Sequence, residues 1–135
     1  MKTFLDSGVL LTAWRGSSAR KVDAARFMMT DEGRQFFTCD NVKLEVLPKP
    51  TFERRQPEVD FYNDHFKIAV ASEPFSVELG VAARVLAKKY GLSAGDALNL
   101  ASAIRQGAEE FITSELPGKP MFRVKDLKVI SLHSL

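Results

Sequence analysis

The stretch that decides the fold is Leu92–Glu115, which reads LSAGDALNLASAIRQGAEEFITSE. Its first part predicts a helix that begins after Ser93, a good N-cap residue, with Asp96 three positions further on, a spacing that resembles a capping box. Gly107 is expected to end this helix. The run Glu110–Thr113 then predicts a short strand, so the stretch as a whole indicates a buried helix that leads into a strand.

The predicted helix is apolar around most of its circumference. At about 100° per residue, one broad face collects apolar side chains: Ala97, Leu100, Ala101, Ile104 and Ala108. Asn99, Ser102 and Gln106 are expected on the opposite face. Asp96 lies at the border of the two faces in the first turn, where a carboxylate can stabilise the helix end or serve a functional site.

Length and composition favour one domain spanning residues 1–135, with 45% hydrophobic residues and ten Phe to build a core. No apolar run approaches the ~20 residues that a membrane-spanning helix needs. Asp6 interrupts the apolar N-terminal run, which argues against a signal peptide, so a cytoplasmic protein is expected. Cys39 is the only cysteine, which excludes an intramolecular disulfide. The net charge of +2 does not by itself predict nucleic-acid binding.

Short strands alternate with helical stretches along the chain. Lys2–Leu5 predicts a first strand closed by Asp6, Gln35–Thr38 a second, and Val129–Leu132 the last, in addition to Glu110–Thr113. This alternation is typical of an α/β fold with a mainly parallel sheet covered by helices.

The helical pattern is clearest in the middle of the chain. Pro48–Pro57 is expected to be a connection, and His65, on the helix that follows it, is expected at the surface. Helices are predicted at Val9–Trp14, around Ala24–Met29, at Asp40–Leu47 with Asp40 as its cap, at Val59–Val70, and from Ser76 to a stop at Gly91.

Four acidic residues stand at the ends of predicted elements: Asp6, Glu45, Asp96 and Glu115. Ligands of open α/β sheets collect at the carboxyl ends of the strands, and Mg²⁺ takes oxygen ligands. Converging carboxylates repel one another, so without a cation at least one should have a raised pKa. Asp6 could instead only cap the following helix, and Glu45 could be an ordinary exposed residue; with 17 acids in the chain, spacing alone leaves both readings open.

The motifs around these acids resemble the PIN domain, the fold of many metal-dependent ribonucleases, including VapC-type toxins. FLDSGVLL, residues 4–11, resembles the family's Leu-Asp-(Thr/Ser)-x-Val-(Leu/Ile) start. DALNLASAIRQGAEEFITSE, residues 96–115, resembles its Asp-Ala-x-x-Leu-Ala-x-Ala-x-x-x-Gly-Ala stretch and the Phe-(Leu/Ile)-Thr-x-Asp that follows. VKLEVLPKP, residues 42–50, resembles the segment that bears the family's Glu.

The resemblance implies a PIN-like three-layer sandwich and an acidic site for Mg²⁺ or Mn²⁺ formed by Asp6, Glu45, Asp96 and Glu115. Asp6 and Asp96 would be direct ligands. Glu45 would be a ligand or a hydrogen-bonded neighbour, and Glu115 a ligand or a holder of water. Ser7, Asn99 and Thr113 would orient water or carboxylates.

Three positions depart from the family pattern. Glu115 stands where the family usually has Asp, Gly8 replaces a frequent polar residue, and Asn99 stands where many members have His. The implied function is a metal-dependent endoribonuclease, with the toxin of a toxin–antitoxin pair as its most specific form. The alternatives are a non-catalytic nucleic-acid-binding or interaction module and, third, another Mg²⁺-dependent phosphohydrolase; no Gly-rich phosphate loop is present.

The expected partners are RNA and, for a toxin, an antitoxin protein. Clustered basic residues could contact the RNA backbone or could be a solvated surface: Arg15, Arg20, Lys21, Arg54 and Arg55. The aromatic segment Phe61–Phe66 could support a homodimer or belong to the core.

Overall fold

The computed structural model describes residues 1–135 and contains one five-stranded sheet in the order β3-β2-β1-β4-β5. Every neighbouring pair of strands is parallel, which confirms the α/β prediction. The strands are β1 (Lys2–Leu5), β2 (Gln35–Cys39), β3 (Ala71–Glu73), β4 (Glu110–Thr113) and β5 (Lys128–Ser131).

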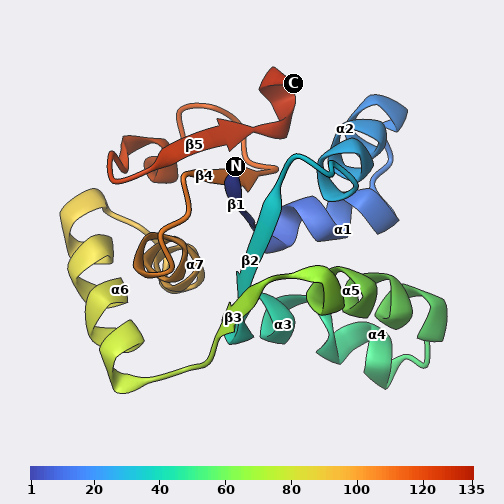
Figure 1. The fold of residues 1–135 in the computed structure, drawn as a ribbon, viewed down its shortest axis with the longest axis horizontal. Helices are drawn as coiled ribbons and strands as arrows, with labels where there is room; N and C mark the ends of the chain where they lie inside the picture. The colour runs from blue at the N-terminus through green and yellow to red at the C-terminus, as the bar shows by residue number, and fades with distance from the viewer.

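Helices cover both faces of the sheet and give the expected three layers (Figure 1), with α6 and α7 on one side and α1, α2, α4 and α5 on the other. No helix is both long enough and apolar enough to cross a membrane. The helices are α1 (Ser7–Arg15), α2 (Ala19–Met29), α3 (Asp40–Val46), α4 (Pro48–Phe52), α5 (Gln56–Ile68), α6 (Val77–Tyr90) and α7 (Ala94–Arg105), with short 3-10 turns η1 (Pro120–Arg123) and η2 (Leu132–Ser134).

The ends of α6 and α7 follow the predicted local chemistry. Ser93 caps α7, since its hydroxyl accepts a hydrogen bond from the Asp96 amide at 3.4 Å. Gly91 ends α6 in the left-handed conformation with φ 70°, which a residue without Cβ adopts at little cost.

The central strand β1 is the point at which the chain changes direction across the sheet. From β1 the chain moves outward through β2 to β3, and it returns to place β4 on the opposite side of β1. All residues of β4 and all of β1 except Lys2 are buried, and the rings of Phe4 and Phe111 stack with centroids 5.5 Å apart. Such a switch point leaves a crevice at the carboxyl end of the strand, and Asp6 is the residue that follows β1.

The structure corrects several local predictions. Pro48–Pro57 is not simply a connection, because Pro48 begins α4, whose first turn suits the fixed φ of proline. The edge strand β3 was not expected, since its three residues show no alternating apolar pattern. The helix predicted at Val59–Val70 begins earlier, with Pro57 in its first turn. Asp40 is the first residue of α3 rather than its cap, and Cys39 holds the cap position.

Two polar residues that were predicted on the face opposite the apolar face of α7 are buried. The exposed fractions of Asn99 and Ser102 are 1% and 0%. The cause is that α7 lies between α6, α3 and β2, so little of its circumference meets solvent. The buried amide of Asn99 therefore needs internal hydrogen-bond partners, and it finds them at the carboxyl edge of the sheet.

Candidate active site

Asp6 is the centre of the site. It is 6% exposed, occupies the N-cap position of α1, and its Oδ1 accepts a hydrogen bond from the Ser7 amide at 3.0 Å. Oδ1 also accepts from Asn99 Nδ2 at 3.0 Å, and Oδ2 accepts from Thr113 Oγ1 at 3.1 Å. Capping and site formation thus coincide at this residue, and Ser7, Asn99 and Thr113 all contact it as donors.

Glu45 joins the site through Asn99. Asn99 Nδ2 donates to Glu45 Oε1 at 2.8 Å as well as to Asp6, so one amide group links the two carboxylates. Glu45 lies on α3, a helix that follows β2 directly. Glu45 is an exposed residue, but its carboxylate contacts Asn99 at the carboxyl edge of the sheet.

The surroundings of Asp6 favour its protonated form. Burial raises the pKa of Asp6 to about 7, and repulsion from the carboxylates of Asp96 and Glu45 also raises it. The hydrogen bonds from Asn99 and Thr113 act in the opposite direction. The prediction that one converging carboxylate should have a raised pKa is confirmed for Asp6.

Asp96 and Glu115 occupy different positions relative to this centre. Asp96 lies in the first turn of α7, half-buried, and its charge acts on Asp6. Glu115 follows β4, and its backbone amide donates to Thr113 Oγ1 at 3.2 Å. The Glu115 side chain is exposed, and it is not among the groups that shift the pKa of Asp6.

The donor set is made of oxygen atoms, which suits Mg²⁺ or Mn²⁺. No group of three or more His, Cys, Asp or Glu side chains is arranged closely enough to hold a metal ion by itself. Mg²⁺ commonly takes only one or two protein carboxylates and completes its shell with water and substrate phosphate. None of the ion pairs in the structure involves Asp6, Glu45 or Asp96. The residues present therefore fit a divalent cation held by few carboxylates.

The basic residues predicted as RNA contacts have different surroundings. Arg15 and Arg55 pair with the buried carboxylate of Glu58, at 2.6 and 3.0 Å. Arg20 donates to the main-chain oxygen of Leu135 at 2.6 Å. The remaining two predicted contacts make no ion pair in the structure: Lys21 and Arg54.

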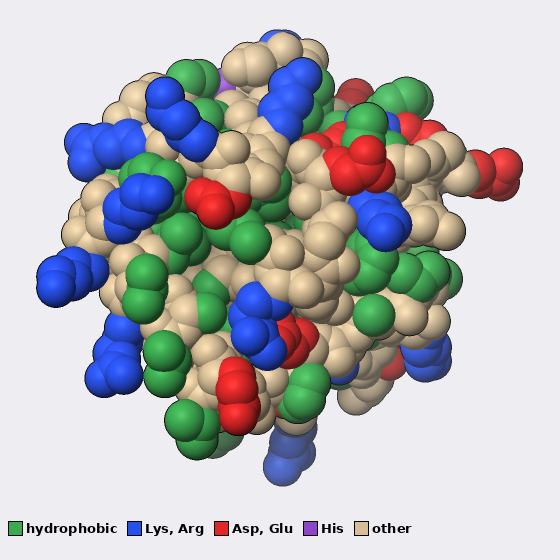
Figure 2. All heavy atoms as spheres, turned by 60° about the vertical axis from the view of Figure 1, so that its left-hand side comes forward, with side chains coloured by type: hydrophobic (Ala, Val, Ile, Leu, Met, Phe, Trp, Pro, Cys, Tyr) green, Lys and Arg blue, Asp and Glu red, His purple; other side chains and the backbone are tan.

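Positive charge is dispersed over the molecular face that brings α6 forward (Figure 2). Lys and Arg side chains stand apart from one another there, several of them along one border, with apolar and uncharged atoms between them. The small net charge of the sequence is thus not concentrated into a single basic surface on this face.

Sequence reasoning missed two residues that surround Asn99. Asn41 Nδ2 donates to Asn99 Oδ1 at 3.0 Å, and the buried Cys39 thiol lies 3.5 Å from the same oxygen. Asn41 precedes Glu45 by four residues, one helical turn, which was the available signal.

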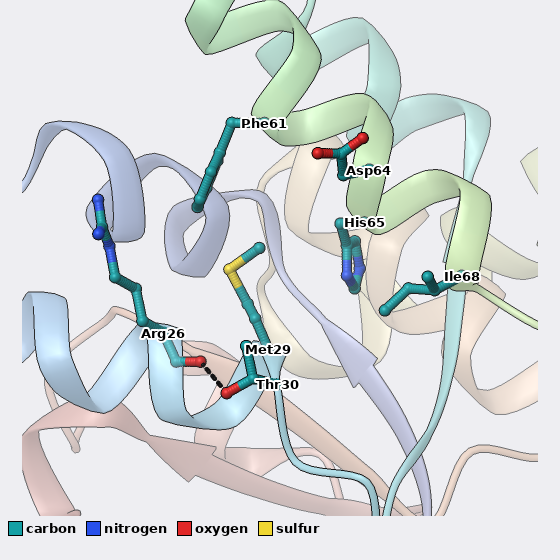
Figure 3. Close-up of a pocket in the computed structure, with 7 residues that line it drawn as sticks. All are labelled: Arg26, Met29, Thr30, Phe61, Asp64, His65 and Ile68. Atoms are coloured by element: carbon teal, nitrogen blue, oxygen red, sulfur yellow. Dashed lines mark hydrogen bonds between the residues drawn. The ribbon is translucent and has the colours of Figure 1, made fainter.

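A separate pocket lies between α2 and α5 (Figure 3) and contains none of the four predicted acids. Its volume is about 390 Å³. His65 lines it and is only 3% exposed, so its predicted surface position is wrong. The ring packs edge-on against Phe36, with centroids 5.3 Å apart, and burial lowers the pKa of His65 to about 4. The lining residues are Arg26, Met29, Thr30, Phe61, Asp64, His65 and Ile68.

The fold and the site together define an α/β protein with a buried carboxylate at the switch point of a parallel sheet, surrounded by further acids and by amide and hydroxyl donors. The family model of the PIN domain matches residues 3–115. The chain belongs to the PIN domain family, as the motifs predicted.

Solved structures with the same fold are distant in sequence. VapBC2 from Rickettsia felis, bound to a DNA fragment from its promoter, has a TM-score of 0.70 at 13% identity and covers 97% of this chain and 98% of its own. A toxin–antitoxin complex from Klebsiella pneumoniae has a TM-score of 0.62 at 16% sequence identity. The match covers 96% of this chain and 97% of the Klebsiella chain. FitAcB from Neisseria gonorrhoeae has a TM-score of 0.65 at 16% sequence identity. The match covers 98% of this chain and 99% of the Neisseria chain. No curated protein matches the chain by sequence. At these identities the likeness shows the fold alone.

Proposed function

We propose that this chain is a metal-dependent endoribonuclease that hydrolyses RNA phosphodiester bonds at the Asp6 site. The observation that carries the proposal is a buried carboxylate, with a pKa raised to about 7, that lies near two further acids and has no cationic side chain as a partner. A group in this state gains most from a bound divalent cation. Membership of the PIN family supports the same activity.

Asp6 and Asp96 would hold the cation, which when bound would supply Lewis acidity toward the scissile phosphate. Thr113, Ser7 and Asn99 hold the Asp6 carboxylate in one orientation through hydrogen bonds to both of its oxygens. Glu45 would accept hydrogen bonds from water entering the site. Glu115, at the exposed end of β4, would orient water on the opposite side.

The proposal is tested by RNA cleavage with purified protein. A structured and an unstructured RNA are incubated with Mn²⁺, Mg²⁺ or a chelator, using the wild type and the variants Asp6→Asn and Asp96→Asn. Changes beside a metal ligand commonly cost 10–100-fold, so loss of a direct ligand should lower cleavage about 100-fold or more. Asp23→Asn, an exposed acid on α2, is the matched control and should cleave normally.

Cleavage that persists in both site variants would refute the assignment of the site and indicate a contaminating nuclease. A folded wild-type protein that cuts neither RNA would refute the enzymatic proposal. The alternative, a non-catalytic nucleic-acid-binding or interaction module, would then be preferred.

We further propose that the chain is the toxin of a toxin–antitoxin pair and associates with an antitoxin protein. A structural neighbour described as a toxin–antitoxin complex supports this proposal. Large apolar side chains that remain exposed on α2 and α4, Phe27 at 71% and Phe52 at 88%, support it as well. If a small open reading frame lies beside the gene, co-expression of its product with this chain should yield a stable complex. A homodimer is also proposed, and sedimentation as a clean 15.0 kDa species would refute it.

A further inference from the structure

Asn41 is a buried polar side chain beside the site to which the chemistry above gives no role. It lies in the first turn of α3. Its Nδ2 is 3.0 Å from Asn99 Oδ1, 3.3 Å from Glu45 Oε1 and 3.4 Å from the main-chain oxygen of Gly95. One amide group therefore contacts its own helix and two positions on α7.

Asn41 and the carboxylates of Asp6 and Glu45 together determine which way the Asn99 amide is oriented. Asn99 Oδ1 accepts from Asn41 Nδ2 and faces the Cys39 thiol, so its Nδ2 must face Asp6 and Glu45. The reverse orientation would place a carbonyl oxygen against two carboxylates and bring two amide nitrogens together. Buried polar groups without partners are costly, so this orientation is disfavoured.

Asn41 also holds α3 close to α7. A Cβ added at Gly95 would lie 3.2 Å from Glu45 Oε2, which shows how closely the Glu45 carboxylate approaches the first turn of α7. Glu45 Oε1 accepts hydrogen bonds from both Asn41 and Asn99, while Oε2 accepts none. The two amides thus fix one carboxylate oxygen and leave the other free.

We propose that Asn41 is a positioning residue that acts through Asn99 and Glu45. It locks the Asn99 amide and fixes the Glu45 carboxylate through Oε1, so that the other oxygen, held beside the first turn of α7, strengthens the binding of a divalent cation. The effect on cation binding rests on the proposed function, whereas the locking of Asn99 does not.

The first test measures Mn²⁺ affinity, from the electron paramagnetic resonance signal of free Mn²⁺, with circular dichroism as a check on folding. Asn41→Ala should weaken binding about 10-fold or more, the usual effect of losing a group that orients a ligand. Asn41→Ala should weaken binding less in a Glu45→Ala background than in the wild type, because part of its effect acts through Glu45. Asn63→Ala, at a half-buried asparagine on α5, should bind as the wild type does.

Two results would overturn the positioning role. One is an Asn41→Ala variant whose Mn²⁺ affinity equals that of the wild type. The other is an Asn41→Ala effect on Mn²⁺ affinity that is as large in the Glu45→Ala background as in the wild type. A purely structural role would produce that second result, because general loosening does not depend on Glu45.

The second test needs no metal. Hydrogen exchange of the Asn99 side-chain amide, followed by ¹⁵N NMR, should be slow in the wild type and in Asn63→Ala and at least 10-fold faster in Asn41→Ala. Unchanged exchange in Asn41→Ala would overturn the locking of Asn99. A wild-type protein that binds no Mn²⁺ but shows the expected exchange would refute the proposed function while the locking of Asn99 stands.

Discussion

Replacing Asp6 by Asn should stabilise the metal-free protein at alkaline pH, although the variant is expected to lose activity. The folded protein raises the pKa of Asp6 from 3.8 to about 7, mainly because the group is buried. A difference of about 3 pKa units corresponds to about 4 kcal/mol at a pH above 7. Asn keeps the shape of Asp6 and can accept from Ser7 and Asn99, while the rearranged hydrogen bond with Thr113 costs about 1 kcal/mol. The net gain is therefore about 3 kcal/mol.

The sign of the pH dependence follows from the direction of the shift. A group whose folded-state pKa is raised contributes fully to stability below its unfolded pKa, and this contribution is lost as the pH rises through the folded pKa. For Asp6 the loss runs from about pH 4 to about pH 7. The stability difference between Asp6→Asn and wild type should therefore grow over this interval and stay constant above it.

Urea unfolding in the presence of EDTA at pH 5 and pH 8 measures this difference, with Asp23→Asn as the control that should match the wild type at both values. Other titrating groups cancel because wild type and variant share them. Adding Mn²⁺ at pH 8 should then stabilise the wild type, since a ligand that binds only the native state raises stability, and should not stabilise Asp6→Asn. An Asp6→Asn protein less stable than wild type at pH 8, or a difference equal at both pH values, would refute the assigned pKa.

Two further predictions concern His65 and the basic residues Lys21 and Arg54. Burial lowers the pKa of His65 from 6.5 to about 4, so the unfolded state binds the extra proton and His65 contributes a loss of about 2 kcal/mol between pH 7.5 and pH 5. Because Asp6 titrates in the opposite direction in both proteins, the loss is measured as the change in the stability difference between wild type and His65→Leu in urea unfolding. A difference that is the same at both pH values would contradict this prediction. Arg54→Ala and Lys21→Ala should each lower RNA affinity broadly and reduce the slope of log affinity against log salt concentration by about 1. A slope that neither change alters would remove both residues from the RNA interface.

The sequence predicted the elements whose local signals agree with their tertiary surroundings. The strand at β1, the cap at Ser93 and the stop at Gly91 all have short-range causes that can be read from adjacent residues. The edge strand β3 has no such signal, because its pairing with β2 is decided by the sheet and its three side chains face solvent or the border of the core. Periodicity placed Asn99 opposite the apolar face of its helix but did not show that this face is also buried, because burial depends on the neighbouring elements.

The candidate site was predictable as a set of acids but not as a network. Motifs pointed to Asp6, Glu45 and Asp96, and the structure brings these three into electrostatic contact. The amide of Asn99, which Asn41 contacts in turn, links Asp6 to Glu45. An asparagine in a helix has no sequence signature for donating to a carboxylate far along the chain. The single hint was the four-residue separation of Asn41 and Glu45 on α3.

A second buried carboxylate in the same protein shows what is particular about Asp6. Glu58 is 2% exposed, and although burial raises its pKa, hydrogen bonds from Tyr62 and Arg15 lower the pKa below its ordinary value. The chain thus supplies cationic partners where a buried carboxylate is to stay ionised within the fold. Asp6 receives only neutral donors, although the sequence contains 19 Lys and Arg residues. Without a cation the raised pKa favours the protonated form of Asp6. Under the proposed function, a divalent cation would supply the compensating charge in a form that oxygen donors bind well.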